Sequence, residues 1–450
     1  MARRTRLDPW LEPRLPQLQN LLKAWAETAY GDDLQAPAEL VSEYLLQHSF
    51  DDIETVGGGD LAAAVVANRR RSGSGAATVL VVGFHDGPWL DGMGEVTVDD
   101  RGIVGPGVAS RFAPFMAHIE AYTGLTEEAA GMPPVNIVAL SLDSASVGTG
   151  QIPQLLDRMD VDDVDVILAT PAIAWDYRAP TITLGARGEL LVELVVSTGR
   201  DLGVNAFAGA ARNSMGALIG ILGQIRDDRG RITVPGFYNR AVPPTTAERE
   251  ALSRDGHDPA AWTRGTGASL LAGGPSPLER ASAWPTVEVV AINSGIKPRV
   301  RSQTLPGAAS ATVNFALVAD QRAAEVSAAL RSWLETRVPE GVDASINVIA
   351  SAEPYLVARN SPWVVSQARA LKRVFGRSPV PVLGGGHPGI GEIASAIGRP
   401  MLFSGIGAAA SFVGTADERI TWQRLQLGVN VGAEILEQLN KRATRLKNEA

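Results

Sequence analysis

The amino-acid sequence predicts an α/β protein of two domains, in which a ferredoxin-like α+β domain interrupts a larger mixed-sheet domain. Two observations predict this class. Short apolar runs separated by helix-length segments occupy both ends of the chain, and a strand-helix-strand-strand-helix-strand pattern occupies its middle. The length of 450 residues, of which 45% are hydrophobic, is sufficient for two or three domains with ample cores.

The first part of the larger domain is placed at residues 1–185. Residues 15–48 have the leucine spacing of a helical region. Three short runs rich in β-branched residues follow at 78–83, 135–141 and 164–170, and they predict buried strands of a parallel or mixed sheet. Loops at the carboxyl ends of such strands are where functional sites tend to form.

The inserted domain is placed at residues 186–351. Alternating residues at 189–196 predict a half-buried strand, and Asn213 has the position of an N-cap for a helix that follows it. A Gly-, Pro- and charge-rich excursion covers 226–283. The remaining elements of this domain are two strands, a helix and a last strand, at 286–292, 309–318, 321–337 and 343–350.

The larger domain resumes at residues 352–450. A helix is predicted from 361 to 375, followed by a glycine-rich loop, a short strand at 400–403 and a final helix from about 421. The order of elements therefore places both ends of the chain in one domain.

Charge and composition exclude several classes of protein. The 41 basic and 49 acidic residues give a net charge of -8, which offers no basic surface for nucleic acid. The absence of cysteine excludes disulfides, thiolate metal sites and a cysteine nucleophile. No apolar run approaches the roughly 18 residues of a membrane span, and no secretory signal follows the basic start, so we expect a cytoplasmic protein without a membrane partner.

Several phrases occur in an order that resembles the zinc peptidase family of dipeptidases, aminoacylases, acetylornithine deacetylases and carboxypeptidase G. They are Arg-Gly at 187–188, Gly-Arg-Asp-Leu at 199–202, Gly-Arg-Ile at 230–232 and Pro-Gly-Phe at 235–237. The resemblance covers about 78 to 440. It implies a catalytic-type domain with an inserted lid and dimerisation domain, a homodimer, and a small peptide-like or N-acyl amino-acid-like molecule as partner.

Members of that family hold two zinc ions with imidazole and carboxylate ligands. Their Gly-His-x-Asp phrase corresponds to Gly83, Phe84, His85 and Asp86, so a phenyl ring occupies the ligand position. The other ligand and base positions fall on Ser110, Ala145, Ser146, Thr170 and Gly414. Because no expected metal-binding side chain remains, the resemblance implies a divergent member with no zinc site, and we expect no other cofactor.

The candidate catalytic residues are those that remain near the former metal positions. His85 and Asp86 form one candidate pair, although adjacent side chains on an extended segment point to opposite sides and a leftover loop explains them better. Ser110 and Ser146 are candidate nucleophiles, with small hydroxyls that fill the vacated volume as the plainer interpretation. His387 follows three glycines and is a candidate acid or base, or else a polar loop residue at a helix start.

The candidate substrate-binding residues come from the resemblance alone. Asn213 matches a lid asparagine, Gly385 and Gly386 lie in the loop that lines the family's substrate pocket, and Glu418 follows the last ligand position. The lid arginine of the family falls near Ala316. A basic cluster in the lid could replace that arginine, although a solvated face explains it better; it consists of Lys297, Arg299 and Arg301.

Three functions remain open at this point. The first is a metal-independent enzyme that forms, cleaves or rearranges an amide or a peptide-like small molecule. The second is a catalytically inactive pseudopeptidase that binds a peptide-like ligand or a partner protein. The third is an ordinary zinc dipeptidase or deacylase whose ligands lie at other positions. Fold resemblance alone does not choose among them.

Overall fold

The structure is a computed structural model that describes residues 7–29, 35–58, 61–70, 75–87, 96–147, 151–174, 180–254, 260, 263, 267–269, 275–294, 304–408 and 411–449. The chain divides into two compact units. The larger unit comprises Met1–Ala186, Pro244–Ala283 and Leu356–Ala450, and the smaller unit comprises Arg187–Pro243 and Trp284–Tyr355. Residues 244–283, placed in the inserted domain from the sequence, thus cluster with the larger unit.

The larger unit is built on a six-stranded mixed sheet in the order β1-β2-β6-β3-β7-β18. The predicted buried strands are confirmed as β3 (Thr78–Phe84), β6 (Asn136–Leu142) and β7 (Val166–Ala169), which run parallel to one another. All seven residues of β3 are buried, which explains its continuous apolar sequence. The hairpin of β1 (Asp51–Gly58) and β2 (Leu61–Arg69), not predicted from the sequence, adds two antiparallel strands.

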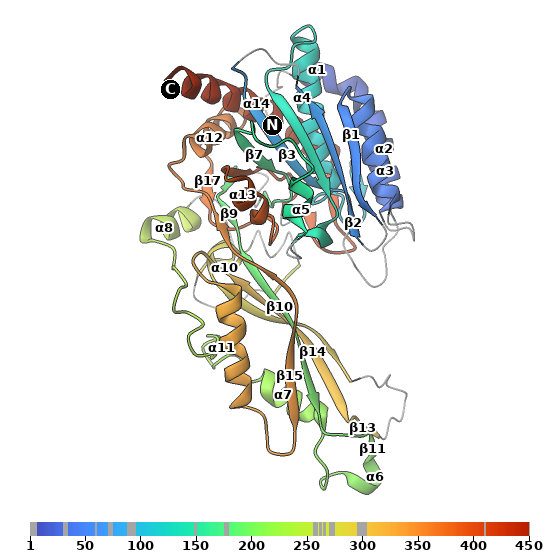
Figure 1. The fold of residues 1–450 in the computed structure, drawn as a ribbon, viewed down its shortest axis with the longest axis vertical. Coiled ribbons are helices and arrows are strands. Elements are labelled where there is room, and N and C mark those ends of the chain that lie inside the picture. Colours follow the sequence, from blue (N-terminus) through green and yellow to red (C-terminus); the bar gives the residue numbers. More distant parts are fainter. Residues whose placement is uncertain are drawn as a thin grey trace. The chain divides into compact units, whose positions relative to one another are not determined.

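Helices cover this sheet (Figure 1). Helix α4 (Phe112–Glu128) packs on β3 and against α14 (Trp422–Glu449), which in turn packs against α12 (Pro362–Phe375). The contact between α4 and β3 is close, because a Cβ atom at Gly83 would lie only 2.5 Å from the Phe115 ring. That close packing fixes the start of α4 relative to the end of β3.

The other elements of the larger unit are short or peripheral. They are α1 (Asp8–Leu11), η1 (Glu12–Arg14), α2 (Leu15–Thr28), α3 (Ala36–Gln47), β4 (Thr97–Val98), β5 (Gly102–Val104), η2 (Ser144–Ser146), α5 (Ile152–Leu156), β8 (Thr181–Thr183), β9 (Gly185–Ala186), α8 (Thr246–Arg254), α10 (Pro277–Ala283), β17 (Val380–Val382), α13 (Gly391–Ile397), β18 (Met401–Phe403) and β19 (Arg419–Thr421). Strand β16 (Tyr355–Leu356) lies where the chain passes between the units.

The smaller unit is ferredoxin-like, as predicted. Its antiparallel sheet has the order β12-β14-β10-β15. Along the chain, helix α7 follows β10 and helix α11 follows β14. Their bounds are β10 (Gly188–Ser197), α7 (Ser214–Leu222), β12 (Thr286–Asn293), β14 (Ala308–Leu317), α11 (Ala323–Glu335) and β15 (Asp343–Ala352), with β11 (Leu202–Gly203), α6 (Val204–Phe207) and β13 (Thr304–Leu305) beside them.

Helices α7 and α11 cover the same face of the sheet in the smaller unit. Leu218 of α7 and Leu330 and Trp333 of α11 share one buried cluster with the inward residues of β10. Strand β10 alternates between buried and half-buried residues along its whole length, which confirms the period-2 pattern of its sequence. Within the described residues, no helix is long and apolar enough to cross a membrane.

Candidate active site

The candidate active site lies in the larger unit, at the carboxyl ends of β3 and β6. These two strands are parallel and paired from Thr78 and Asn136 to Phe84 and Leu142, so they end at the same edge of the sheet. The side chains that follow each strand therefore meet. This edge is where ligands bind in many parallel α/β sheets.

Asp86 lies at the centre of this meeting point and is 8% exposed. Its Oδ1 accepts a hydrogen bond from the Ser144 backbone N–H at 3.0 Å, and its Oδ2 accepts one from the Ser144 hydroxyl at 2.6 Å. Asp143 holds the same turn by accepting from the Ala145 N–H at 2.8 Å. Burial and the neighbouring Asp86 raise the pKa of Asp143, against the opposing effects of Ala145 and Arg111.

Arg111 brings a positive charge to this cluster. Its Nη1 lies 3.3 Å from Asp86 Oδ1, and its guanidinium carbon lies 5.1 Å from the centre of the Phe84 ring. Arg111 immediately precedes α4 and is held largely buried, with 13% of its side chain exposed. A guanidinium carries five N–H donors in a planar fork, of which the Asp86 contacts use one nitrogen.

Sequence reasoning missed Arg111. It directly follows Ser110, which the resemblance matches to the bridging aspartate of the zinc peptidases. The sequence did contain a signal for this residue. Arg111 is a cation directly after the serine that stands in place of the family's aspartate, and both follow a glycine-containing turn. Only the close packing of α4 on β3 reveals that the cation points to Asp86 and Phe84.

His387 completes the cluster. Its ring meets the Phe84 ring edge-on, with 4.8 Å between the ring centres. Its Nδ1 donates to the Pro388 carbonyl at 2.7 Å, so the lone pair of the neutral ring lies on Nε2. Burial lowers the pKa of His387 to about 4, and Arg111 lowers it too, against the opposing effects of Pro388 and Asp86.

Backbone hydrogen bonds fix the loop that carries His387. The Gly386 N–H donates to the Gly185 carbonyl at 3.0 Å, and the Gly385 carbonyl accepts from the Ile173 N–H at 2.9 Å. A Cβ atom at Gly386 would lie 2.2 Å from the Phe403 ring, so only glycine fits this position. The predicted contact of these two glycines with substrate stays a prediction, but their place beside His387 follows from this packing.

His85 is separated from the cluster, as the alternation of an extended segment requires. Its Nδ1 lies 3.1 Å from the Ser141 hydroxyl, its side chain is 1% exposed, and its carbonyl accepts from the Trp25 indole at 2.8 Å. Burial lowers the pKa of His85 to about 4, while Asp86 and Ser141 oppose this shift. Among the described residues, the buried Nε2 of His85 has no hydrogen-bond partner. The His85 ring thus bonds to Ser141 in the described structure, and a joint role of His85 and Asp86 stays a prediction.

Glu418 is fully buried and ties two loops together. Its Oε1 accepts from the N–H groups of Ala109 and Ser110 at 2.8 and 2.7 Å, and its Oε2 accepts from the Gly414 N–H at 2.8 Å. Burial raises the pKa of Glu418, against the effect of these hydrogen bonds. The Glu418 carboxylate thus accepts hydrogen bonds from backbone N–H groups, and these bonds hold Ser110 and the neighbouring Arg111 in position.

The remaining candidate residues lie apart from this cluster or beside it. Ser146 is buried in the short helix η2, where its N–H donates to the Asp143 carbonyl at 3.0 Å. Asn213 is in the smaller unit and caps α7, as predicted, by accepting from the N–H groups of Met215 and Gly216 at 3.0 and 3.3 Å. Three residues of the lid's basic cluster lie outside the described residues: Lys297, Arg299 and Arg301.

The side chains that the resemblance places at the family's ligand positions are poor zinc ligands. Phe84 offers a phenyl ring, Ser110 is followed by the cation of Arg111, and the Thr170 hydroxyl is buried and donates to the Val82 carbonyl at 3.0 Å. Among the residues that the structure describes, no group of three or more histidine or acidic side chains could hold a metal ion. The chemistry of the described site is instead that of a buried cation, a carboxylate and a neutral imidazole.

Comparisons with known proteins agree with this architecture. Residues 184–342 match the model of the peptidase dimerisation domain of M20 peptidases. The mouse Beta-Ala-His dipeptidase is 22% identical over 367 residues, which is 79% of this chain and 74% of that protein. The di-peptidase Dug1p from Saccharomyces cerevisiae superimposes with a TM-score of 0.83 at 19% identity, covering 96% of this chain and 97% of that one. Human carnosine dipeptidase 1 gives 0.82 at 18% identity, with 96% and 98% covered.

Proposed function

From the premise that this chain is a divergent relative of the M20 zinc peptidases, with their fold and their dimerisation domain, we propose a metal-independent enzyme. It acts on an amide bond of a small peptide-like or N-acyl amino-acid-like molecule. The observation that carries this proposal is the Arg111 guanidinium, which is bound to Asp86 at the edge of the sheet where the zinc peptidases use metal. The dipeptidases among its relatives support the class of substrate.

Arg111 is the electrophilic group of this proposal. Its remaining N–H donors can bind the carbonyl oxygen of an amide and stabilise the negative charge that develops there when the carbonyl carbon is attacked. Asp86 and the turn at Ser144 hold the guanidinium in place beforehand, so little reorganisation is needed during the reaction. The largely buried position strengthens the interaction, because water screens it less than at the surface.

His387 is the base. Its lowered pKa of about 4 keeps the ring neutral at pH 7, so Nε2 can accept the proton of an attacking water while the water oxygen bonds to the carbonyl carbon. The same ring then returns this proton to the departing amine as the C–N bond breaks. A pKa this far below 7 makes His387 a weak base, and we therefore expect a slow enzyme or an activated amide as substrate.

The test is a screen of dipeptides and N-acyl amino acids with purified protein, with and without chelator and with and without added zinc. We expect turnover that survives the chelator and falls at least about a hundredfold in the His387→Ala and Arg111→Gln variants. His85→Asn serves as the control, because the His85 ring faces Ser141 and lies apart from Arg111. About two zinc ions per chain by mass spectrometry, with activity that depends on them, would restore an ordinary zinc hydrolase.

A pseudopeptidase is the second candidate, and one observation favours it. The Ser144 hydroxyl donates to Asp86, and a carboxylate is a weaker base for a serine nucleophile than the histidine of a serine hydrolase. In that case Arg111 would bind the carboxylate of a peptide-like ligand through charge-assisted hydrogen bonds. Calorimetric binding of a dipeptide, without product over long incubation, would select this function over the enzyme.

We also propose that the protein forms a homodimer in the cytoplasm. The match to a peptidase dimerisation domain supports the dimer. The edge strand β12 supports it too, because it exposes Val290 and Ile292 at 59% and 49%. We therefore expect a second copy of the chain to pack against the β12 edge of the four-stranded sheet.

A further inference from the structure

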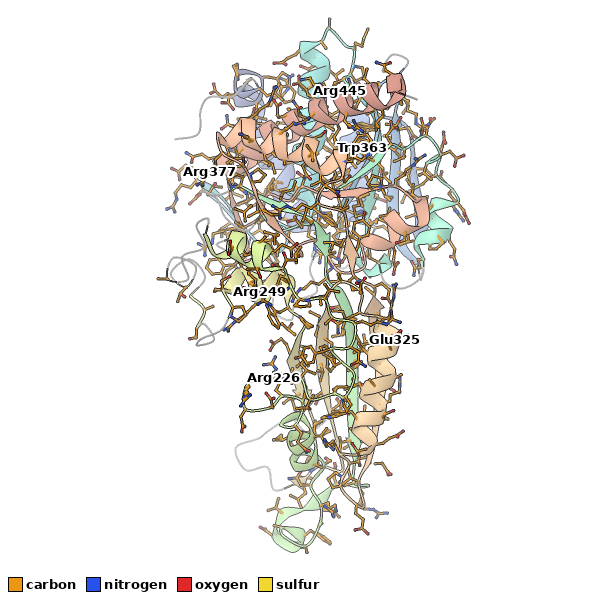
Figure 2. All side chains as sticks on the ribbon, turned by 90° about the vertical axis from the view of Figure 1, so that its left-hand side faces the viewer. Arg226, Arg249, Glu325, Trp363, Arg377 and Arg445 are labelled. Carbon is orange, nitrogen blue, oxygen red and sulfur yellow. The ribbon has the colours of Figure 1, made fainter. Side chains whose placement is uncertain are left out.

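A groove of about 180 Å³ lies between α12 and α14, and basic side chains line it. Figure 2 labels Trp363 of α12 and Arg445 of α14, which mark these two helices. The described lining contains no acidic residue. It consists of Pro362, Val365, Ser366, Arg369, Gln438, Lys441, Arg442 and Arg445. On α14 the last four have the i, i+3, i+4, i+7 spacing of a single helix face.

The arginines of this groove lack acidic partners. In the described part of the chain, Arg369, Arg442 and Arg445 take part in no salt bridge, and the buried Nε of Arg442 has no hydrogen-bond partner. Lys441 reaches Glu437 only at 3.9 Å, and that acid does not line the groove. Gathering like charges on facing helices is unfavourable unless an anion neutralises them.

The interface between the two helices does not lack acids in general. Arg373, one helical turn beyond Arg369 on α12, forms a 3.2 Å salt bridge with Glu434 of α14. The same two helices therefore neutralise Arg373 with an internal ion pair but leave the arginines of the neighbouring groove without an acidic partner in the described residues. This contrast indicates that the positive charge of the groove is available to bind an anionic ligand.

We propose that this groove binds a phosphate-bearing anion. Arginine forks bind phosphate oxygens with paired N–H donors, and the volume of the groove suits one or two phosphate groups. Arg442 supplies the recessed donor, and Arg369 and Arg445 supply exposed donors from the two helices. This site involves none of the residues of the candidate active site and is independent of the proposed amide chemistry.

The experiment is calorimetric titration of the full chain with inorganic pyrophosphate, at two salt concentrations. We expect binding that weakens with salt and falls about tenfold or more in the double variant Arg369→Gln/Arg445→Gln, because the variant removes two charged donors from the groove. Both residues are exposed, so this variant should melt like the parent protein. Arg442→Met, which keeps the apolar stem, should weaken binding further.

Arg373→Gln is the matched control, since it removes a cation from the same helix outside the groove. A second arm replaces pyrophosphate with vesicles of phosphatidylcholine with and without phosphatidic acid. Pyrophosphate binding that the double variant loses identifies a soluble phosphate ligand, and binding only to phosphatidic acid vesicles, lost in the same variant, identifies a lipid headgroup. No binding in either arm, or equal loss in Arg373→Gln, overturns the proposal.

Discussion

At the scale of single residues, the site depends on a few buried polar groups whose partners come from distant parts of the chain. Asp86 is bound by Ser144, 58 positions away, and by Arg111, 25 positions away. Spacing in the sequence cannot reveal such pairs, because it depends on which strands lie next to each other. The resemblance matched Phe84 and Asp86 to the family's metal-binding segment, but spacing along the chain could not identify Arg111 as the cation that meets them.

The Glu418 carboxylate gives the first prediction at this scale. Glu418→Ala would leave the buried N–H group of Ala109 and the part-buried N–H groups of Ser110 and Gly414 without their acceptor. A buried group left in this way costs about 1–3 kcal/mol and a part-buried one less, so we expect a loss of roughly 2–4 kcal/mol in the free energy of unfolding. Urea denaturation measures it, with Glu418→Gln expected to retain part of the stability. An unchanged midpoint would contradict the structural role of Glu418.

At the scale of elements, the strands and helices follow their sequence patterns closely. The predicted helix at 361–375 is α12, Pro362–Phe375, and the predicted strands at 286–292 and 309–318 are β12 and β14. These elements have clear apolar periods, and period is a local property of the chain. The hairpin of β1 and β2 was not predicted, and its place at the end of the sheet is set by pairing with β6.

The cap of α7 gives a prediction at this scale. The Asn213 side chain accepts hydrogen bonds from two N–H groups of the first turn. Asn213→Ala removes this acceptor and should lower the stability by about 1 kcal/mol. Asn213→Asp, which keeps an acceptor, should be nearly neutral. Thermal unfolding of the two variants side by side decides the point, and equal melting of both would assign Asn213 another role.

The edge strand β12 gives a second prediction at this scale. Placing aspartate at Val290 and Ile292 introduces charges at the exposed apolar edge where we expect a second copy to pack. The variant should elute as a monomer, while the parent protein elutes as a dimer, in size-exclusion chromatography with light scattering. Leu46→Asp, at a 66% exposed residue of the larger unit, is the control. A dimer that persists in the double variant would place the interface elsewhere.

At the scale of the whole molecule, the two units differ in how they should respond to acid. Burial is the main cause that lowers the pKa of His85, His118 and His387 to about 4, and all three lie in the larger unit. His118 is 0% exposed, donates from Nδ1 to the Pro114 carbonyl at 2.8 Å, and accepts at Nε2 from the Ser404 hydroxyl at 2.9 Å. The fold thus holds these rings neutral.

This arrangement predicts acid sensitivity with a defined sign. Between a pKa of about 4 in the folded chain and about 6.5 in the unfolded chain, the unfolded state binds more protons, so stability is full above this window and falls as the pH drops through it. Each histidine contributes a slope of up to about 1.4 kcal/mol per pH unit. Urea denaturation from pH 7.5 to 4.5 should show a shallower slope in His118→Gln. An unchanged slope would show that His118 is not held neutral.

The two-domain α/β class and the ferredoxin-like order of the inserted unit followed from the amino-acid sequence, because apolar period and element order can be read along the chain. The resemblance also placed a phenyl ring, Phe84, at a position where the family has a zinc ligand. Only the packing of the folded chain brings Arg111 to Asp86 and Phe84, turns His85 toward Ser141, and groups residues 244–283 with the larger unit. These facts depend on which segments pack together, since a buried charge takes its role from the neighbours that replace water around it.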